Sequence, residues 1–481
     1  MDYFTSIVAL IGIVIVVASL LSRVVERVGV PFVAVFLVLG AILGPLGLGL
    51  LDIHLEDPSL RTLAILALAL VLFSDAVTIE TRMLRTQRKL LWRLLGPGTL
   101  LPAAVIAFFG WLLLDLSVPA AAIVGAALAS TDPVLLRTVT RSRALSPLSR
   151  AVLRLEGGVN DVVLLPIVVL AMIVAREGAD GLTGAELGHH ALGLFVLGPA
   201  LGGVVGWVGI TLLASVRDRI GVRRDYEALY ALGLALSAYA SAEAVGGSGF
   251  LAAFTAGFIV SVQDVELCDC FLEYGEATAE MLLLLTFVAL GTSLIWSGLS
   301  IIDGRMLLFA FIALFARTVA LFPLLVGTGM GRRDRTLVAL FGPRGLSSLL
   351  FALLPVFDNM AGAEDLFAIV CLVVLLSVVL HGGGIALFLR RNTPRDEGPA
   401  PVPEPVAAEE PQVPERITLA ELAELRERGE PTILVDARAE RSYNGSDLQA
   451  SGSVRLQPDD PVRSALEQRL SRQATLVVYC A

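Results

Sequence analysis

The chain is built mainly from long apolar runs that alternate with short polar segments, and this pattern continues from Tyr3 to Leu389. A helix that crosses the hydrocarbon core of a bilayer needs about 20 mostly apolar residues, and the runs have about that length. The pattern therefore predicts about thirteen membrane-spanning helices. The expected spans lie near residues 3–21, 30–49, 60–77, 92–114, 118–139, 149–175, 188–213, 226–244, 247–262, 279–298, 305–327, 335–357 and 364–389.

The composition supports this interpretation, because 56% of the residues are hydrophobic and only 17% are charged, with a mean hydropathy of +0.79. A single water-soluble core does not account for these values. We therefore predict an all-α polytopic membrane protein whose main partner is membrane lipid. The first apolar run lacks the positively charged segment that opens a secretory signal, so we expect a retained first helix.

Basic residues orient the predicted spans, because lysine and arginine are retained in cytoplasmic loops. Four basic clusters fall on one side of the membrane: residues 81–89, 217–224, 331–335 and 390–391. Three arginines fall on the other side: Arg61, Arg176 and Arg305. We expect a multi-pass protein of the cell (inner) membrane, with its N-terminus outside and its C-terminal part in the cytoplasm.

The composition changes sharply after residue 391. Residues 392–415 are rich in Pro, Ala and Glu, which is typical of an extended linker. Residues 416–481 then contain an amphipathic helical pattern and two short apolar strands, "TILVDAR" and "ATLVVYC". We predict a membrane domain over residues 1–391, this linker, and a small, partial α/β domain.

Two apolar spans are interrupted by polar residues beside Pro or Gly. The first interruption is "STDP" at 130–133, where Pro133 cannot continue the helical hydrogen bonds, so we expect a break at Ser130 to Asp132. The second is "GPRG" at 342–345. Broken helices at membrane depth are tolerated where they line a cavity or bind a ligand, and in transporters they mark the substrate site. We predict two inverted halves whose discontinuous helices cross near the membrane centre.

Few ionisable residues lie well inside the predicted spans, while Asp75 and Glu243 lie nearer to span ends. The inner residues are Asp132, Arg154, Glu156, Asp161, Arg317 and Arg344. An unpaired charge at mid-bilayer costs about 2.5–3.5 kcal/mol or more, so these groups must face one another or water. We expect Arg344 to pair with Glu156, either as a structural ion pair or as part of the ligand site. Arg317 has no partner nearby in the sequence and is interpreted as structural.

The second polar cluster adds oxygen-bearing side chains. Glu156 and Asn160 are four residues apart and share a helical face, while Asp161 lies about 100° further round. Burial penalises a carboxylate's charge, so a buried aspartate can hold either a proton or a small cation, and this competition is sufficient for antiport. Oxygen ligands suit hard monovalent cations, and the candidates are Thr131, Asp132, Asn160 and Asp161. Purely structural roles for both aspartates remain the alternative.

Other function classes lack their signatures in this sequence. No GxxxxGK[ST] phosphate loop is present, which excludes nucleotide binding through that motif. The net charge of −9 does not favour nucleic-acid binding. No cluster of soft ligands indicates copper or zinc transport. We expect no cofactor, because Na⁺, K⁺ or Li⁺ and H⁺ would be the transported species.

Four motifs resemble those of the NhaP-type cation:proton antiporters. They are "STDP" at 130–133, "EGGVND" at 156–161, "GGSGFLAAFTAGFIV" at 246–260 and "GPRG" at 342–345. The resemblance covers about residues 1–391. It implies inverted repeats and a homodimer in which a core domain moves past a dimerisation domain in an elevator-like cycle.

The same resemblance assigns roles to individual residues. It makes Asp161 the main cation and proton carrier, with Thr131, Asp132 and Glu156 around the ion, and it matches Arg344 to the arginine that pairs with Glu156. Asn160 before Asp161 resembles the electroneutral branch, with one proton exchanged for one Na⁺ or K⁺. Gly157 departs from the pattern, because many family members carry Ser there, and a hydroxyl ligand is missing.

The tail resembles a rhodanese-like domain through "ILVDAR" at 433–438 and "LVVYCA" at 476–481. In that family the cysteine at the position of Cys480 begins an active-site loop. The sequence ends one residue later, so we do not expect sulfurtransfer and the protein is predicted not to be an enzyme. The tail is then a truncation or a regulatory remnant. The alternatives to an antiporter are a cation channel on the same scaffold and a transporter regulated by a sulfur- or redox-sensing tail.

Overall fold

A computed structural model shows two compact units, Met1–Pro394 and Arg395–Ala481. The sequence predicts the change of domain after residue 391, close to this division. In the first unit the structure describes residues 11–20, 32–45, 47–55, 57–79, 88–132, 135–136, 139–140, 145–177, 184–220, 222–263, 269–292 and 294–392. In the second unit it describes residues 422, 428, 431–438, 443, 449–456, 464–465, 468, 470–471 and 474–479.

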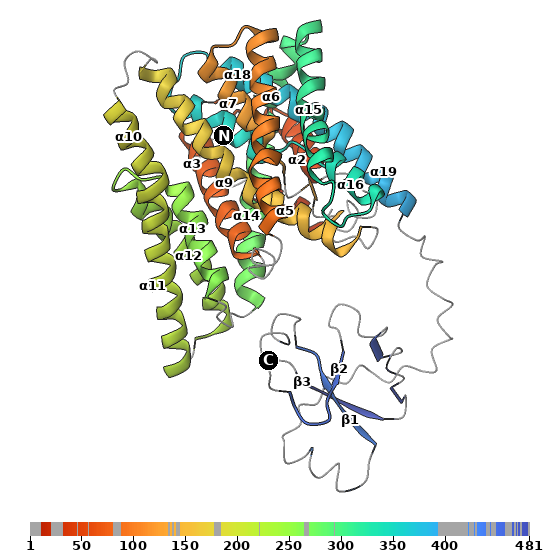
Figure 1. The fold of residues 1–481 in the computed structure, drawn as a ribbon. Coiled ribbons are helices and arrows are strands. Elements are labelled where there is room, and N and C mark those ends of the chain that lie inside the picture. Colours follow the sequence, from red (N-terminus) through yellow and green to blue (C-terminus); the bar gives the residue numbers. More distant parts are fainter. Residues whose placement is uncertain are drawn as a thin grey trace. The chain divides into compact units, whose positions relative to one another are not determined.

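Within its described residues, the first unit is mostly helical (Figure 1). Its main helices are α2 (Phe32–Leu43), α3 (Pro58–Val77), α5 (Arg88–Leu95), α6 (Pro97–Leu114), α7 (Val118–Ala129), α9 (Pro147–Glu177), α10 (Gly184–Leu192), α11 (Gly198–Arg219), α12 (Arg224–Glu243), α13 (Gly249–Val262), α14 (Asp269–Thr292), α15 (Gly304–Leu324), α16 (Arg332–Leu340), α17 (Leu346–Phe357), α18 (Ala363–Ser377) and α19 (Gly383–Asn392). Three short turns join them: η1 (Gly193–Leu197) and η3 (Val378–Gly382) are π-helical, and η2 (Leu294–Ile301) is 3₁₀.

Six helical stretches among the described residues are long and apolar enough to cross a membrane, or seven if the bent pair Ala277–Thr292 and Leu294–Ile301 forms one span. Shorter apolar helices, such as α7, α13 and α17, account for several other predicted spans. The protein is thus a mostly helical, multi-pass membrane protein, but the predicted number of thirteen spans is not confirmed. Part of the first predicted span lies outside the described residues.

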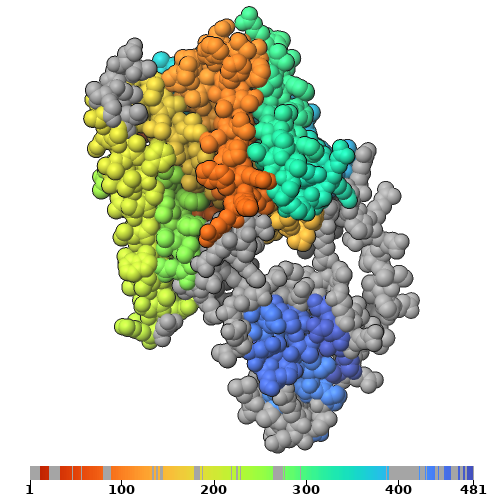
Figure 2. Space-filling model, viewed as in Figure 1, coloured from red at the N-terminus to blue at the C-terminus, as the bar shows by residue number. Residues whose placement is uncertain are grey.

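Small residues let the helices of this unit approach closely. A Cβ atom added to Gly40 of α2 would lie 2.8 Å from the backbone of Gly291 in α14, and one added to Gly202 of α11 would lie 2.5 Å from the Cα of Ala252 in α13. In lipid, such close packing takes the place of a hydrophobic driving force between helices. Figure 2 shows α6 and α15 side by side on one face, where they also pack together.

The structure breaks two helices where the sequence predicts interruptions. Helix α7 ends at Ala129, and Ser130 to Asp132 continue in a non-helical conformation. Helices α16 and α17 are likewise separated by the non-helical residues 341–345. The polar side chains and proline or glycine at these two positions therefore end helices within otherwise apolar sequence.

The second unit contains a parallel sheet of three strands in the order β2–β1–β3. Strands β1 (Thr432–Asp436) and β3 (Thr475–Tyr479) fall on the two predicted strands, whereas the two-residue β2 (Val454–Arg455) is not predicted. Most of the predicted helix before β1 lies outside the described residues, and so does Cys480. The structure therefore gives no geometry for the rhodanese-like cysteine.

Candidate functional site

The two helix breaks are joined by hydrogen bonds through one residue. The backbone N–H of Asp132 donates to the carbonyl of Pro343 at 3.0 Å, and the N–H of Leu346 donates to the Asp132 carboxylate at 2.9 Å. Asp132 is buried, and both donors lie at breaks where helical partners are missing. The carboxylate of Asp132 therefore accepts a hydrogen bond from the first backbone N–H of α17. The dipole of this helix also favours a negative charge at its N-terminus.

The second break contains two glycines that lie directly against buried charged side chains. A Cβ atom at Gly345 would overlap the Asp132 carboxylate, and one at Gly342 would lie 2.6 Å from Cδ of Arg317. No larger residue can occupy either position without moving a buried charged side chain. Glycine is therefore needed on both sides of Arg344, because the backbone at Gly345 lies against Asp132 and the backbone at Gly342 lies against Arg317.

Asp161 lies on α9 beside the first break and is 2% exposed. The hydroxyl of Ser130 donates to its Oδ1 atom at 2.5 Å, and the Ser347 side chain hydrogen-bonds to the same carboxyl group. Asp132 is also close enough for its charge to act on Asp161. Two carboxylates and two hydroxyls, from α9, from α17 and from the break after α7, therefore converge at the crossing.

Asn160 extends this oxygen-rich cluster. Its Nδ2 atom donates to the hydroxyl of Thr131 at 2.6 Å, and the residue is 1% exposed. Its Oδ1 atom and the Ser348 hydroxyl are buried without a hydrogen-bond partner in the part of the chain that the structure describes. Buried acceptors without partners are unusual in proteins. The two residues that carry them are the sequence neighbours of Asp161 and Ser347.

Glu156 forms an ion pair with Arg317, and not with Arg344 as the sequence predicts. Nε of Arg317 donates to Oε1 at 2.6 Å and Nη2 donates to Oε2 at 2.5 Å, so the contact is bidentate. Nη1 of Arg317 also donates to the carbonyls of Val338 and Ala339, each at 2.9 Å. The long α15 carries Arg317 to the C-terminal end of α16, a tertiary contact that local sequence does not reveal.

Arg344 instead binds the C-terminal end of α7. Its Nη1 atom donates to the carbonyls of Ala129 and Ser130 at 2.8 and 3.0 Å. A guanidinium suits this position because free carbonyls give a helix C-terminus a partial negative charge. Arg344 is fully buried, and its Nε and Nη2 atoms have no partner among the described residues.

The crossing therefore brings together Thr131, Asp132, Asn160 and Asp161, with the pair Glu156–Arg317 and the arginine Arg344 beside them. Sequence reasoning missed Ser130 and Ser347. Serine is common in apolar helices, and its spacing alone gives no signal for a contact with Asp161. The position of Ser130 within "STDP" was the one available clue.

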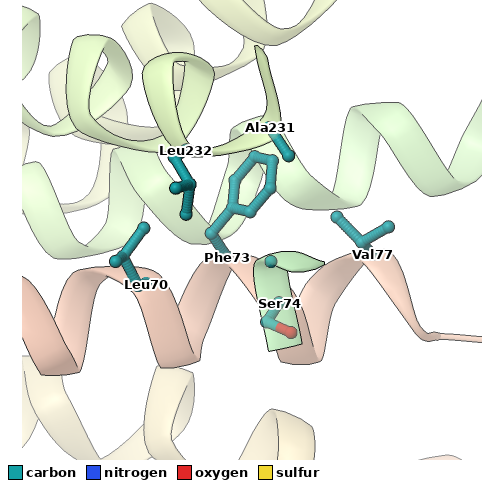
Figure 3. A pocket seen from close by; sticks show the side chains of 7 residues that line it. Leu70, Phe73, Ser74, Val77, Ala231 and Leu232 are labelled. Atoms are coloured by element: carbon teal, nitrogen blue, oxygen red, sulfur yellow. The ribbon is translucent and has the colours of Figure 1, made fainter. Parts of the chain in front are cut away.

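The described residues contain no group of three or more His, Cys, Asp or Glu side chains that could hold a metal ion. A separate pocket lies between α3, α12 and α14 and is shown in Figure 3. It is lined by Leu70, Phe73, Ser74, Val77, Ala231, Leu232 and Gly275. Because these residues carry no ionisable side chain, the pocket lacks the chemistry found at the crossing.

The chain is similar to several proteins of known class. The model of the transmembrane sodium/hydrogen exchanger family matches residues 12–391. The K⁺/H⁺ antiporter NhaP of Alkalimonas amylolytica is 24% identical, over 83% of this chain and 69% of the relative. The K⁺/H⁺ antiporter NhaP2 of Shewanella oneidensis is 29% identical, over 79% and 66%. The chain thus spans about two thirds of the length of these relatives.

A solved structure shows a related fold. The sodium proton antiporter MjNhaP1 of Methanocaldococcus jannaschii is 23% identical and superimposes with a TM-score of 0.62, over 80% of this chain and 100% of that one. The family match covers most of the chain, and its members are secondary transporters and not enzymes. The chain therefore belongs to the sodium/hydrogen exchanger family, in its NhaP-type branch of cation:proton antiporters.

Proposed function

We propose that the protein is a secondary active antiporter that exchanges a monovalent cation for H⁺ by competition at Asp161. The observation that carries this proposal is the environment of Asp161. Its carboxyl group is buried at the crossing of two broken helices and is held by the hydroxyls of Ser130 and Ser347. A carboxyl group in such a place needs a proton or a bound cation to balance its charge.

Na⁺ is the proposed cation, with K⁺ and Li⁺ as the alternatives. The relatives named above are K⁺/H⁺ antiporters, and the related solved structure is of a sodium proton antiporter. The buried groups near Asp161 are oxygen atoms, which suit all three ions. Gly157 supplies no hydroxyl, so the preference among these ions rests on the remaining ligands.

We place the cation between Asp161 and the first break, with Thr131, Asp132 and Asn160 as further ligands. The unpartnered Oδ1 of Asn160 supports this arrangement because it is a buried oxygen on a side chain that contacts Thr131 in the first break. Both oxygens of Glu156 bond to Arg317. We therefore place Glu156 beside the cation site as a fixed charge pair and not in contact with the ion.

The proposed cycle is electroneutral and elevator-like. Asn160 is uncharged and the Asp132 carboxylate is bound to the N–H of Leu346, so Asp161 would be the one carboxylate that exchanges a proton for a cation. The proposed assembly is a homodimer built on inverted repeats in the cell membrane, with the N-terminus outside and the C-terminal unit in the cytoplasm. Such exchange would contribute to pH homeostasis.

Exchange in liposomes tests the proposal directly. Purified protein should dissipate an imposed pH gradient when Na⁺, K⁺ or Li⁺ is added, and Asp161→Asn should abolish this activity. The matched control is Asp115→Asn, which changes an aspartate whose side chain is 82% exposed and should leave exchange unchanged. Normal exchange in the Asp161→Asn variant would remove the basis of the proposal.

Voltage dependence separates antiport from a channel. At a clamped membrane potential, an electroneutral exchanger should run at the same rate at every voltage, because no net charge moves. A cation channel should instead follow the potential. A rate that changes with voltage would contradict the proposed stoichiometry.

The tail is proposed to regulate transport and not to catalyse sulfurtransfer. Deletion of residues 392–481 should change the pH or redox dependence of exchange while leaving exchange itself intact. An identical pH and redox profile in the deletion variant would argue against this role.

A further inference from the structure

Two residues outside the predicted site lie beside the second break: Ser377 at the end of α18, which contacts the break, and His381 in the turn η3, which contacts Ser377. The backbone N–H of Arg344 donates to the hydroxyl of Ser377 at 2.7 Å, and Ser377 Oγ lies 3.0 Å from Nδ1 of His381. Ser377 is fully buried and His381 is 7% exposed. Neither residue belongs to a motif that the sequence singles out.

The chemistry of these contacts fixes the role of each group. The N–H of Arg344 lies in the break, where no helical carbonyl receives it, so the Ser377 hydroxyl replaces the missing acceptor. Because Ser377 Oγ accepts this bond, its own hydrogen is free to point to Nδ1 of His381. We assign His381 as the neutral tautomer with its proton on Nε2. His381 then fixes the rotation of the Ser377 hydroxyl.

The local helix geometry places His381 within a rare feature. Ser377 ends α18, and His381 lies in the π-helical turn η3 that follows it directly. Single π-helical turns within α-helices often occur at functional sites. The Phe315 ring of α15 lies beside the imidazole, with 6.4 Å between ring centroids. The Phe315 ring thus contributes to the burial of the histidine.

These contacts continue through Arg344 to the proposed cation site. The Arg344 guanidinium holds the carbonyl of Ser130 at 3.0 Å, and the hydroxyl of the same serine donates to Asp161 at 2.5 Å. His381, Ser377, Arg344, Ser130 and Asp161 therefore form one continuous series of contacts. It connects the last long helix of the membrane unit to the carboxyl group at the crossing.

We propose that Ser377 and His381 are positioning residues for cation exchange. They hold the backbone of Arg344 in place, and Arg344 in turn holds the end of α7 so that the Ser130 hydroxyl stays on Asp161. Loss of either residue would therefore shift the Ser130 hydroxyl and, through it, the carboxyl group of Asp161. All the proposed cation ligands would still be present. This inference rests on the proposed function of Asp161.

Kinetics of exchange test the positioning role. Ser377→Ala and His381→Leu should each raise the KM for the cation about tenfold, the effect expected from one misplaced hydrogen bond, and leave the maximal rate within about twofold. The double variant should be no worse than Ser377→Ala alone, because both changes break the same series of contacts. His381→Asn, which keeps a polar atom near the Nδ1 position, should restore the wild-type KM. Ser241→Ala is the control, since that hydroxyl bonds only within its own helix α12 and its loss should not change KM.

Hydrogen exchange gives a readout that does not depend on transport. Loss of the Ser377 hydroxyl should increase amide exchange in the peptide that contains Arg344 by about tenfold, and helix α17 should be unaffected. An unchanged KM in both single variants overturns the proposal, whether or not the Arg344 amide exchanges faster. An additive double variant, or no rescue by His381→Asn, overturns it as well.

The two proposals fail in different ways. Wild-type protein without cation-dependent exchange would contradict the proposed function, while the hydrogen-exchange result would still report on the Arg344 contact. Size-exclusion profiles identify a variant that does not fold. If Ser377→Ala is such a variant, the comparison of His381→Leu with His381→Asn decides the question.

Discussion

Glu156 and Asp161 lie five residues apart on the same helix, but their two carboxyl groups have different kinds of hydrogen-bond partner. Glu156 receives a bidentate contact from Arg317, whose remaining donor binds two backbone carbonyls. Asp161 is held by the hydroxyls of Ser130 and Ser347. Both groups are buried, so burial alone does not distinguish a structural carboxylate from a functional one.

The difference lies in the charge of the partner. A fixed guanidinium balances the charge of Glu156 permanently, so the pair can remain ionised inside the protein. A hydroxyl can donate to a carboxylate, but it brings no balancing charge. In the proposed function, the charge of Asp161 is therefore balanced by an exchangeable proton or cation, whereas the charge of Glu156 is balanced by the fixed guanidinium of Arg317.

Breaking the Glu156 pair should have the largest effect on stability. Glu156→Gln leaves the buried Arg317 without its counter-charge, and we expect a loss of about 3–5 kcal/mol. Thermal unfolding in detergent measures this loss. Asp161→Asn should change stability by less than about 1 kcal/mol, because the amide oxygen still accepts the Ser130 bond.

A double variant sharpens the same comparison. Glu156→Leu combined with Arg317→Met removes both charges and should recover most of the stability lost by the single change. If the double variant is as unstable as Glu156→Gln, the ion pair is not the cause.

Closing the space at the crossing should have the next largest effect. An alanine at Gly345 overlaps the Asp132 carboxylate, and we expect a cost of about 1–3 kcal/mol together with a loss of exchange. Gly233→Ala in α12 is the control, since an added Cβ there meets nothing within 4 Å. Equal effects of the two changes in unfolding and transport assays would show that close approach is not what Gly345 provides.

Removal of the Ser130 hydroxyl tests whether the partners of Asp161 matter. Ser130→Ala deletes one hydrogen bond to the carboxyl group, and a cost of about 1.4 kcal/mol corresponds to about tenfold weaker cation activation. The KM of exchange in liposomes measures it. Ser215→Ala, where the exposed hydroxyl bonds to its own helix, should leave the KM unchanged, and a matching rise there would discount the Ser130 result.

Asp436 of the second unit is also paired with an arginine. We expect this pair to contribute less stability than the Glu156 pair, and its contribution should depend on pH. A hydrogen-bonded contact with Arg438 lowers the pKa of this carboxyl group to about 2, compared with about 3.9 in an unfolded chain. Because the folded pKa is the lower one, the pair stabilises the unit fully above about pH 5, and this contribution is lost as the pH falls toward about 2.

Hydrogen exchange at different pH values checks this expectation. Protection of the β1 amides, corrected for intrinsic exchange, should be constant from pH 7 to pH 5 and should fall below about pH 4. Asp436→Asn should show weaker protection at neutral pH and a shallower fall in acid. The same fall in wild type and variant would assign it to another group.

The sequence predicts the two helix breaks because Asp132 with Pro133, and Arg344 between two glycines, are conspicuous in apolar surroundings. It does not predict that Arg317 pairs with Glu156, since 161 positions separate them and α15 has no interruption that marks Arg317 as special. Ser377 and His381 escape notice for a similar reason. A serine in an apolar helix and a lone histidine carry no local signal of what they contact.

The same limit applies to the number of spans and to the tail. The hydropathy pattern shows only how long an apolar segment is. It therefore predicts one span over α16 and α17, although a non-helical segment separates these two helices. In the tail, β1 and β3 are long enough for their apolar pattern to show, whereas the two residues of β2 are defined only by pairing with β1. Tertiary contacts, and not local pattern, determine these features.

The two bonds through Asp132 have a mechanical consequence. One backbone donor and one carboxylate acceptor of Asp132 tie the end of α7 to the start of α17, so pulling the breaks apart would break two buried hydrogen bonds at once. A load on either half-helix is therefore transmitted to the other. Motion that carries the two breaks together keeps both bonds and therefore costs less than motion that separates them.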